Sequence, residues 1–223
     1  AGFDKKTATD PVTETDRLVE RTVISDLSAS YPDHKFIGEE SIGGEIVLSG
    51  DPTWIIDPID GTANFVHRVP HCCVSIGLAV ERELVVGVVF NPITDELFEA
   101  RRGGGARLNG RPIRVSSVST IAEAMVISEY GSERTPAKRA LMESSLHRIL
   151  EAGPQAIRAL GAAALDMCYV ACGRADIYLE YGPWIWDVAA SVPIILEAGG
   201  VLLHPAGREF DPLSRGVLVA NPH

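Results

Sequence analysis

The sequence predicts an α/β (α+β) protein made of two abutting parts. Residues 73–115 are dense in short apolar runs separated by turn residues, which indicates a largely antiparallel sheet. After about Ser117 the chain alternates between strand-like and helix-like segments, which indicates an α/β unit. We therefore expect an N-terminal α+β domain over residues 1–117 and a C-terminal α/β domain over residues 118–223, with no flexible linker between them.

The N-terminal part begins with a predicted helix over residues 13–29. Its apolar residues recur at helical spacing, Thr13 and Asp16 form a capping-box-like start, and Tyr31-Pro32 ends it. The predicted strands of this part lie at 35–37, 53–56, 74–80, 84–90, 96–100 and 113–116. The first two of these strands run directly into acidic residues.

In the C-terminal part, the sequence predicts a helix over residues 136–152 that stops at Gly153. Its inward-facing residues are expected to be Leu141, Leu146, Ile149 and Leu150. Further helices are predicted at 162–171 and 186–197, the second ended by Gly199-Gly200. Strands are predicted at 124–130, 176–181, 201–204 and 216–221.

Composition limits the classes of function. The chain has 223 residues, 46% of them apolar, which is enough for a sizeable core. Its 20 Lys and Arg against 30 Asp and Glu give a net charge of −10, so no nucleic-acid or anionic-membrane partner is expected. An acidic enzyme can still bind an anionic substrate when divalent metals invert the charge of its site.

The pattern of cysteines is typical of a protein from a reducing compartment. Cys72, Cys73, Cys168 and Cys172 form no CxxC pair, so buried free thiols are expected instead of a zinc knuckle or a redox dithiol. No signal peptide and no membrane-spanning apolar run is present in the sequence given. A cytoplasmic location is the expectation.

The stretch WIIDPIDGTANF, residues 54–65, places two aspartates three residues apart directly after an apolar strand. Pro58 favours a turn in which Asp57 and Asp60 converge, Gly61 permits close approach of a ligand, and Thr62 is a suitable N-cap for a helix over 63–68. A helix N-terminus binds anions such as phosphate. Carboxylates beside a phosphate require divalent cations between them, and oxygen ligands favour Mg²⁺ or Mn²⁺. The alternative is a polar turn closed by an Asp-Gly bend.

Several motifs together resemble the inositol monophosphatase family of lithium-sensitive, Mg²⁺-dependent phosphatases. They are KKTATDPVTETD at 5–16, GEES at 38–41, DPIDGTANF at 57–65, GGGARLNG at 103–110, WDVAA at 186–190 and EAGG at 197–200. The resemblance spans nearly the whole chain in order. It implies a layered αβαβα sandwich, hydrolysis of a small phosphomonoester such as inositol monophosphate, and a homodimer.

The resemblance also implies a metal site. A first Mg²⁺ would be held by Glu39, Asp57 and the carbonyl of Ile59, and a second by Asp57, Asp60 and Asp187. A weaker third site would involve Asp16 through water. Mn²⁺ is a possible substitute for Mg²⁺, and Li⁺ would inhibit.

Catalytic and substrate-binding roles follow from the same resemblance. Glu39 and Thr62 would position the attacking water, with Asp16 nearby. Substrate would be held by Lys5, Asp60, Gly61, Thr62, Ser132, Ala163 and Glu180. The segment YGPWIWD departs from the vertebrate inositol phosphatases, which more often have His-Cys where Trp184-Ile185 stand here, so selectivity among inositol and sugar phosphates is open.

Most of these residues have simpler explanations when each is taken alone. Asp16 and Asp187 fit helix-capping acids, and Glu180 fits a strand-end acid. Glu40 and Lys5 fit solvated side chains. His67 and His71 show no partner pattern, so solvent-facing or structural roles are expected for them.

Rival functions differ in what they require of the sequence. Haloacid-dehalogenase-like phosphatases use D-x-D-G-T, whereas this chain has D-x-x-D-G-T in mid-chain. A bisphosphate nucleotidase or a fructose-1,6-bisphosphatase would use a similar metal site, but the loops are short and no basic patch for a second phosphate is visible near Glu180. Hydrolysis of a related sugar phosphate such as galactose 1-phosphate is the alternative. A non-catalytic metal and sugar-phosphate binder would not need to keep Glu39, Asp57, Asp60, Thr62 and Asp187.

Overall fold

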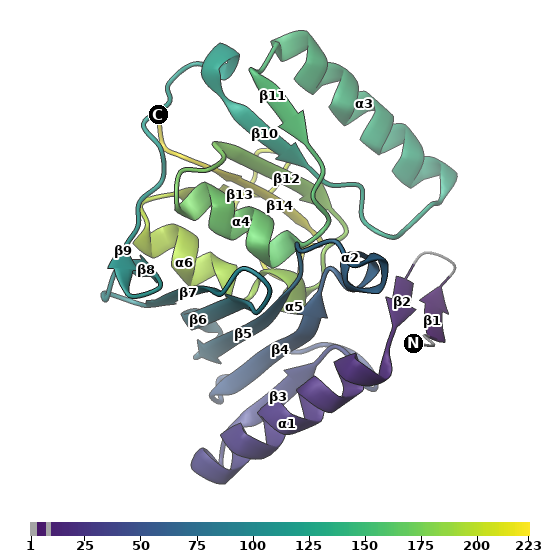
Figure 1. Ribbon diagram of the computed structural model, residues 1–223, viewed down its shortest axis with the longest axis vertical. Helices are drawn as coiled ribbons and strands as arrows, with labels where there is room; N and C mark the ends of the chain where they lie inside the picture. Colours follow the sequence, from purple (N-terminus) through teal and green to yellow (C-terminus); the bar gives the residue numbers. More distant parts are fainter. Residues whose placement is uncertain (1–3, 8–9) are drawn as a thin grey trace.

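Two β-sheets are layered between helices in the computed structural model, which describes residues 4–7 and 10–223, with side chains from Thr13 onward. Figure 1 shows the order of the layers: α1 (Glu14–Ser30), a seven-stranded sheet, a middle helical layer, a five-stranded sheet and α3 (Pro136–Ala152). The middle layer consists of α4 (Ala163–Ala171), α5 (Ile185–Val188) and α6 (Ser191–Glu197). The predicted αβαβα sandwich is therefore confirmed.

The seven-stranded sheet is antiparallel except for its first pair of strands, which is parallel. In order across the sheet its strands are β3 (Lys35–Gly38), β4 (Thr53–Asp60), β5 (Cys73–Val80), β6 (Glu83–Asn91), β7 (Glu96–Arg101), β8 (Ala106–Leu108) and β9 (Arg111–Pro112). Every residue of β4 is buried, because α1 covers one side of the strand and the middle layer covers the other.

Strand β4 is longer than predicted. It does not end at Ile56 but continues to Asp60, with a shift of register against β5 between Asp57 and Asp60. The irregularity includes Pro58, which has no N–H to donate to a ladder. The two aspartates therefore lie at a bulged strand end and not in a free turn.

The five-stranded sheet mixes parallel and antiparallel pairs. Its strands, in order, are β11 (Ala156–Arg158), β10 (Met125–Ser128), β12 (Ile177–Tyr181), β14 (Gly216–Ala220) and β13 (Val201–Leu203). The remaining elements are the hairpin β1 (Asp4–Thr7) and β2 (Asp10–Val12), helix α2 (Thr62–His67) and a 3₁₀ turn over Ile121–Glu123.

The termini of the two long helices agree with their sequence signals. Thr13 and Asp16 form the predicted capping box at the start of α1. Pro136 begins α3, and Gly153 ends it in a left-handed conformation with φ of 69°. These local signals decide a boundary without help from the rest of the fold.

Two predictions in the C-terminal part are wrong in detail. Leu141 and Leu150 of α3 are 40% and 60% exposed, not inward-facing. At roughly 100° per residue they lie about 180° apart on the helix, so they form the two edges of the apolar arc whose centre packs inward. The single helix predicted at 186–197 is instead α5 and α6, separated at Ala189-Ala190.

The predicted strand at 113–116 is also wrong. The regular pairing of the sheet stops at β9, and the chain leaves it toward the middle layer, where the Val115 N–H donates to the Ala198 carbonyl at 3.1 Å. Nearby, the Glu197 carboxylate accepts the N–H groups of Gly103 and Gly105, each at 2.7 Å. The EAGG and GGGARLNG motifs are thus joined to each other, at a distance from the acidic residues of 57–60.

The middle layer packs very closely on the seven-stranded sheet. Helix α6 lies against β6 and β7, and a Cβ added to Gly87 would overlap the carbonyl oxygen of Ala190 and lie 2.9 Å from Cγ of Pro193. Glycine at this position lets the main chain of the helix layer touch the sheet.

We expect Gly87→Ala to destabilise the fold, because the helix layer would have to move away from the sheet. The cost should be about 1–3 kcal/mol or more, measured as the free energy of unfolding in urea. Gly50→Ala is the matched control, since nothing lies within 4 Å of a Cβ there. Equal stability of the two variants would contradict this account of the packing.

Candidate active site

One cavity of about 290 Å³ collects most of the residues singled out from the sequence. The predicted residues that line it are Glu39, Asp57, Ile59, Asp60, Gly61, Thr62, Ser132, Ala163, Glu180 and Asp187. They come from both sheets and from the middle layer, so the fold brings together segments that are more than a hundred residues apart. Asp16 is not in the cavity wall, and the side chain of Lys5 lies outside the part of the chain that the structure describes.

Parallel pairing places Glu39 beside the aspartates of β4. Strands β3 and β4 end at the same edge of the sheet, and the Glu39 N–H donates to the Ile56 carbonyl at 3.1 Å. The turn after β3 is held by Glu20 of α1, whose carboxylate accepts the Glu40 N–H at 2.8 Å. Glu20 is buried and was not predicted from the sequence.

Among the predicted metal ligands, Asp57 is the carboxylate with an unpartnered oxygen. It is 2% exposed, and its Oδ1 has no hydrogen-bond partner among the described residues. Burial raises the pKa of Asp57 well above its usual range, and the neighbouring Glu39, Asp60 and Asp187 carboxylates raise it further. A buried carboxylate oxygen without a donor is strongly unfavourable unless a cation or a proton compensates it.

Asp60 is compensated in part by the start of α4. Its carboxylate accepts the N–H groups of Ala163 at 3.2 Å and Ala164 at 2.7 Å. Burial nevertheless raises the pKa of Asp60 to about 7, against the lowering effect of those two N–H groups. The Ala163 backbone, predicted to line the substrate pocket, thus also supports an acidic side chain.

Asp187 combines a capping position with a place in the cavity. It is the third residue of α5, and its carboxylate accepts the Trp184 N–H at 2.7 Å. Burial raises the pKa of Asp187 well above its usual range, and the charges of Asp60 and Glu39 add to this effect. The capping explanation and the metal-ligand prediction therefore apply to the same side chain.

Thr62 is not the N-cap that the sequence suggested. Gly61 is the N-cap of α2, with a φ of 82°, and Thr62 is the first helical residue. A Cβ on Gly61 would lie 3.0 Å from Cβ of Ala162, so glycine suits both the backbone angle and the packing. Thr62 Oγ1 instead donates to the Ile59 carbonyl at 2.9 Å, which is the predicted main-chain metal ligand.

Asp16 lies behind Thr62. It is fully buried, its carboxylate accepts the Thr13 N–H at 2.8 Å as part of the capping box, and its other oxygen lies 3.3 Å from Thr62 Oγ1. Its contacts in the structure explain it as a helix cap that also orients Thr62.

Glu180 forms the other end of the cavity. It is 7% exposed and accepts a hydrogen bond from the Tyr178 hydroxyl. Burial raises the pKa of Glu180 to about 7, in spite of that hydrogen bond. Ser132, by contrast, lies at an exposed part of the cavity wall.

Several cavity residues were not predicted as site residues. They are Ala63, Glu129, Gly131, Arg134, Gly161, Gly182, Trp184 and Trp186. Glu129 directly follows β10, but the predicted strand over 124–130 enclosed it, so no signal in the sequence indicated that it faces the cavity. Arg134 and the glycines had no such signal either.

The sequence suggested no basic patch for a second phosphate near Glu180, but two basic side chains from distant parts of the chain do interact with it. Lys138 interacts electrostatically with Glu180, and Arg215 with both Glu180 and Asp187. These residues are 42 and 35 positions away from Glu180 in the chain, as their residue numbers give, so local inspection of the sequence missed them.

The histidines and cysteines take no part in the cavity wall. His71 is buried and its Nε2 lies 2.8 Å from Asp166 of α4, whereas His67 is exposed. Burial lowers the pKa of His71 to about 4 and raises that of Asp166 well above its usual range, so burial disfavours the charged form of each. The contact joins the turn before β5 to α4, which fits a structural role. All four cysteines are free, and three of them are buried, as predicted.

The donor chemistry of the cavity fits a hard divalent cation. The predicted ligands are carboxylate and carbonyl oxygens, and the unpartnered Oδ1 of Asp57 lies among them. Within the described ranges no three His, Cys, Asp or Glu side chains converge into a closed ligand set. A cation here would therefore complete its coordination with main-chain oxygen, water or substrate, as is usual for Mg²⁺.

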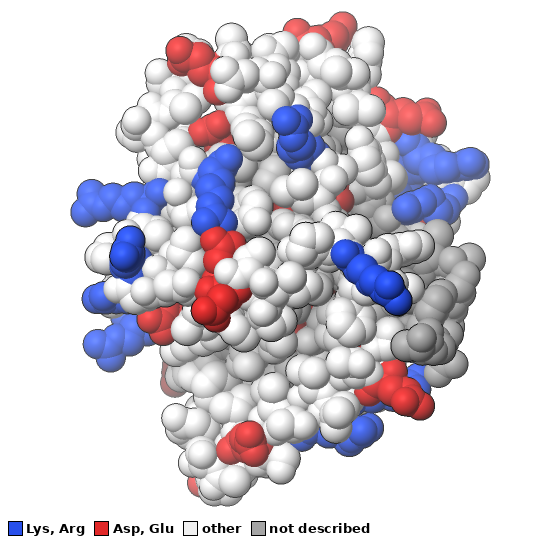
Figure 2. Space-filling view, viewed as in Figure 1, with Lys and Arg blue, Asp and Glu red and all other residues white. Residues whose placement is uncertain are grey.

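The distribution of basic side chains and the character of the helices bear on the expected absence of nucleic-acid and membrane partners. On the face shown in Figure 2, Lys and Arg side chains form separate groups with uncharged surface between them. No helix within the described part of the chain has the length and apolar character needed to cross a membrane.

Comparisons with known proteins agree with the geometry. The model of the inositol monophosphatase family matches residues 2–223. Inositol monophosphatase 2 of Solanum lycopersicum is 47% identical over 227 residues, which cover 99% of this chain and 84% of that protein. Among solved structures, the suhB protein of Bartonella henselae matches with a TM-score of 0.90 and 34% identity. The match covers 100% of this chain and 84% of the suhB chain. An inositol monophosphate-bound SaIMPase-II structure has a TM-score of 0.80 and 27% identity, covering 93% and 78% of the two chains.

The raised pKa values predict how stability depends on pH without divalent cations. A carboxylate whose folded-state pKa is raised stabilises the fold at low pH and loses that contribution as pH rises through the raised value. For Asp60 this loss of stability extends over the pH range from its ordinary pKa of 3.8 to its raised pKa of about 7. In chelator, we expect the thermal midpoint to fall by at least about 4 °C between about pH 5 and pH 8, since one pKa unit is about 1.4 kcal/mol.

Asp60→Asn should flatten that decline, whereas the exposed Asp95→Asn should not. Saturating Mg²⁺ should restore the midpoint at pH 8. A midpoint that rises with pH in chelator would show that the acidic cavity is compensated by other groups.

Proposed function

The chain belongs to the inositol monophosphatase family, and from this premise we propose that it hydrolyses inositol monophosphate to inositol and phosphate in a reaction that depends on divalent metal. One observation supports the proposal above all others. Glu39, Asp57, Ile59, Asp60 and Asp187, from three separate segments, line one cavity in which a buried carboxylate oxygen lacks a donor. This arrangement has a clear physical role only when positive charge enters the cavity.

The proposed ligands divide into two sets that share Asp57. Glu39, Asp57 and the Ile59 carbonyl would hold one Mg²⁺, and Asp57, Asp60 and Asp187 a second, with Mn²⁺ as a possible substitute. Bound metal supplies positive charge to the phosphoryl oxygens and lowers the pKa of a water molecule. A third ion near Asp16 stays a prediction.

The residues of the chain orient the other reactants. Thr62 is held by its bond to the Ile59 carbonyl and by its contact with Asp16, so its hydroxyl has a fixed place beside Glu39 from which to position water. The Gly61 and Thr62 N–H groups would bind phosphate at the cavity wall. Glu180, with Ser132 and Ala163, would bind hydroxyl groups of the substrate.

Other substrates, the oligomeric state and the location of the protein are still to be tested. A galactose 1-phosphate or bisphosphate substrate would use the same cavity, and no observation favours it over inositol monophosphate. Lys5, the homodimer and a cytoplasmic location stay predictions from the resemblance. A non-catalytic binder would keep the ligands but release no phosphate.

The first experiment is phosphate release from inositol 1-phosphate with and without Mg²⁺. We expect rapid, Mg²⁺-dependent release, and slower release from fructose 1,6-bisphosphate, an adenosine bisphosphate and galactose 1-phosphate. Preference for one of these other esters would keep the metal site and change the substrate. Metal binding without release from any ester would leave only the binder.

Asp57→Asn is the control for the chemistry. Because Asp57 belongs to both proposed ligand sets, the variant should lose at least about a hundredfold in kcat at saturating Mg²⁺. Its fold should persist, since the substitution removes a buried charge that repels three neighbours. Substantial turnover by a folded Asp57→Asn protein would refute the assignment.

Lithium provides an independent test of the family property. We expect millimolar Li⁺ to inhibit uncompetitively with respect to the ester, because the ion would enter after the substrate has reacted. The measurement is the initial rate over a grid of ester and Li⁺ concentrations. No inhibition by millimolar Li⁺ would place this chain outside the lithium-sensitive group, and inhibition that the ester relieves would contradict entry of the ion after the substrate has reacted.

A further inference from the structure

The segment 181–186 joins the two ends of the candidate site. Glu180 precedes it in β12, Asp187 follows it in α5, and both line the cavity together with Gly182, Trp184 and Trp186. Residues 182–184 of the segment lie outside regular structure, so the conformation of this connection depends on the groups that satisfy its main-chain carbonyls.

Two basic side chains bind consecutive carbonyls of this segment. Lys138 Nζ donates to the Tyr181 carbonyl, and Arg215 donates from Nε at 3.0 Å and Nη2 at 2.5 Å to the Gly182 carbonyl. The Gly182 N–H returns a bond to the Arg215 carbonyl at 2.8 Å. Hydrogen bonds from charged donors are roughly twice as strong as neutral ones.

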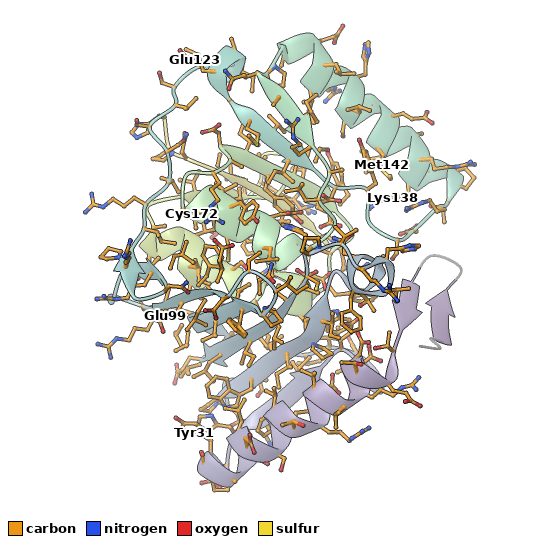
Figure 3. All side chains as sticks on the ribbon, viewed as in Figure 1. Tyr31, Glu99, Glu123, Lys138, Met142 and Cys172 are labelled. Carbon is orange, nitrogen blue, oxygen red and sulfur yellow. The ribbon has the colours of Figure 1, made fainter. Side chains whose placement is uncertain are left out.

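These two cations come from elements outside the segment. Lys138 is only 8% exposed and lies in the first turn of α3, where Figure 3 labels it, and Arg215 directly precedes β14. A Cβ on Gly182 would lie 2.7 Å from Lys138 Nζ, so the glycine lets the ammonium group sit against the main chain. The cations thereby fix the segment to α3 and to the five-stranded sheet.

Arg215 also supports the aromatic part of the segment. Its guanidinium carbon lies 3.4 Å from the ring centre of Trp184, and Trp184 stacks on Trp186 with 5.3 Å between ring centres and 21° between planes. The main-chain N–H of Trp184 donates to the Asp187 carboxylate at 2.7 Å. Arg215 is thus connected to Asp187 through a single residue.

We propose that Lys138 and Arg215 form a two-cation clamp on segment 181–186 and act as positioning residues for the reaction. The clamp sets the position of Glu180 relative to Asp187, and so couples recognition of the alcohol part of the substrate to binding of the cation. The proposal rests on the proposed function for the roles of Glu180 and Asp187. Both clamp residues act through their contacts with the segment, main-chain carbonyls for both and the Trp184 ring for Arg215, and not by touching the reacting atoms.

The test compares Arg215→Lys and Lys138→Met with two exposed controls, Arg148→Lys and Arg139→Met. Arg215→Lys keeps the charge and loses the paired donors, and Lys138→Met keeps most of the side-chain length and loses the donor. Three quantities are measured for each protein: KM for inositol 1-phosphate, Mg²⁺ affinity by calorimetry without ester, and the thermal midpoint.

We expect both clamp variants to weaken Mg²⁺ binding and to raise KM, each by about tenfold to a hundredfold, because each loses a charge-assisted hydrogen bond. The controls should change by less than about twofold. If Lys138→Met does not fold, Arg215→Lys decides the question alone, because it keeps the charge, most of the side-chain length and one donor.

Two outcomes would overturn the clamp. A rise in KM with unchanged Mg²⁺ affinity would mean that the cations attract the substrate directly. A lower thermal midpoint with both constants unchanged would mean a purely structural role. If the wild-type protein hydrolyses no ester, the proposed function fails, whereas weaker Mg²⁺ binding by Arg215→Lys would still support the clamp.

Discussion

Repulsion among buried carboxylates is the constraint on which this structure depends. Asp57, Asp60 and Asp187 are each removed from water, and each raises the cost of ionising its neighbours. The protein compensates them unequally: Asp60 accepts two main-chain N–H groups, Asp187 accepts one, and Asp57 retains an oxygen with no donor among the described residues. In the cavity this oxygen of Asp57 is therefore left for a cation or a proton to compensate.

The layered architecture creates this constraint and also contains it. The bulged end of β4 brings Asp57 and Asp60 to the sheet edge, while the starts of α4 and α5 in the middle layer point N–H groups toward the same edge. Close packing of α6 on Gly87 fixes the separation of these layers. The distance between the ligands is thus set by sheet-to-helix packing, which is stiff, and not by the loops that carry them.

The sequence predicted those features that short-range signals specify. Capping and stop residues located the ends of α1 and α3. The spacing of Asp57 and Asp60 beside Gly61 and Thr62 indicated a metal and phosphate site, and the family resemblance added Glu39 and Asp187 to it. Features that depend on distant contacts were missed or wrong. Leu141 and Leu150 are exposed because they lie at the two edges of the apolar arc of α3, and the strand predicted at 113–116 is lost where the Val115 N–H bonds to the Ala198 carbonyl. Thr62 failed as an N-cap because Ala162 and the main chain around it require glycine one residue earlier.

The basic residues near Glu180 show why residue type alone is a weak guide to ligand choice. Lys138 and Arg215 approach Glu180 in space, so an argument against a second substrate phosphate can no longer rest on the absence of cations there. Their donors, however, are directed at the carbonyls of Tyr181 and Gly182, and the guanidinium of Arg215 lies against Trp184. A second phosphate would have to compete with these main-chain bonds and leave carbonyl oxygens without donors. The case for a monoester therefore rests on how these cations are engaged and not on their number.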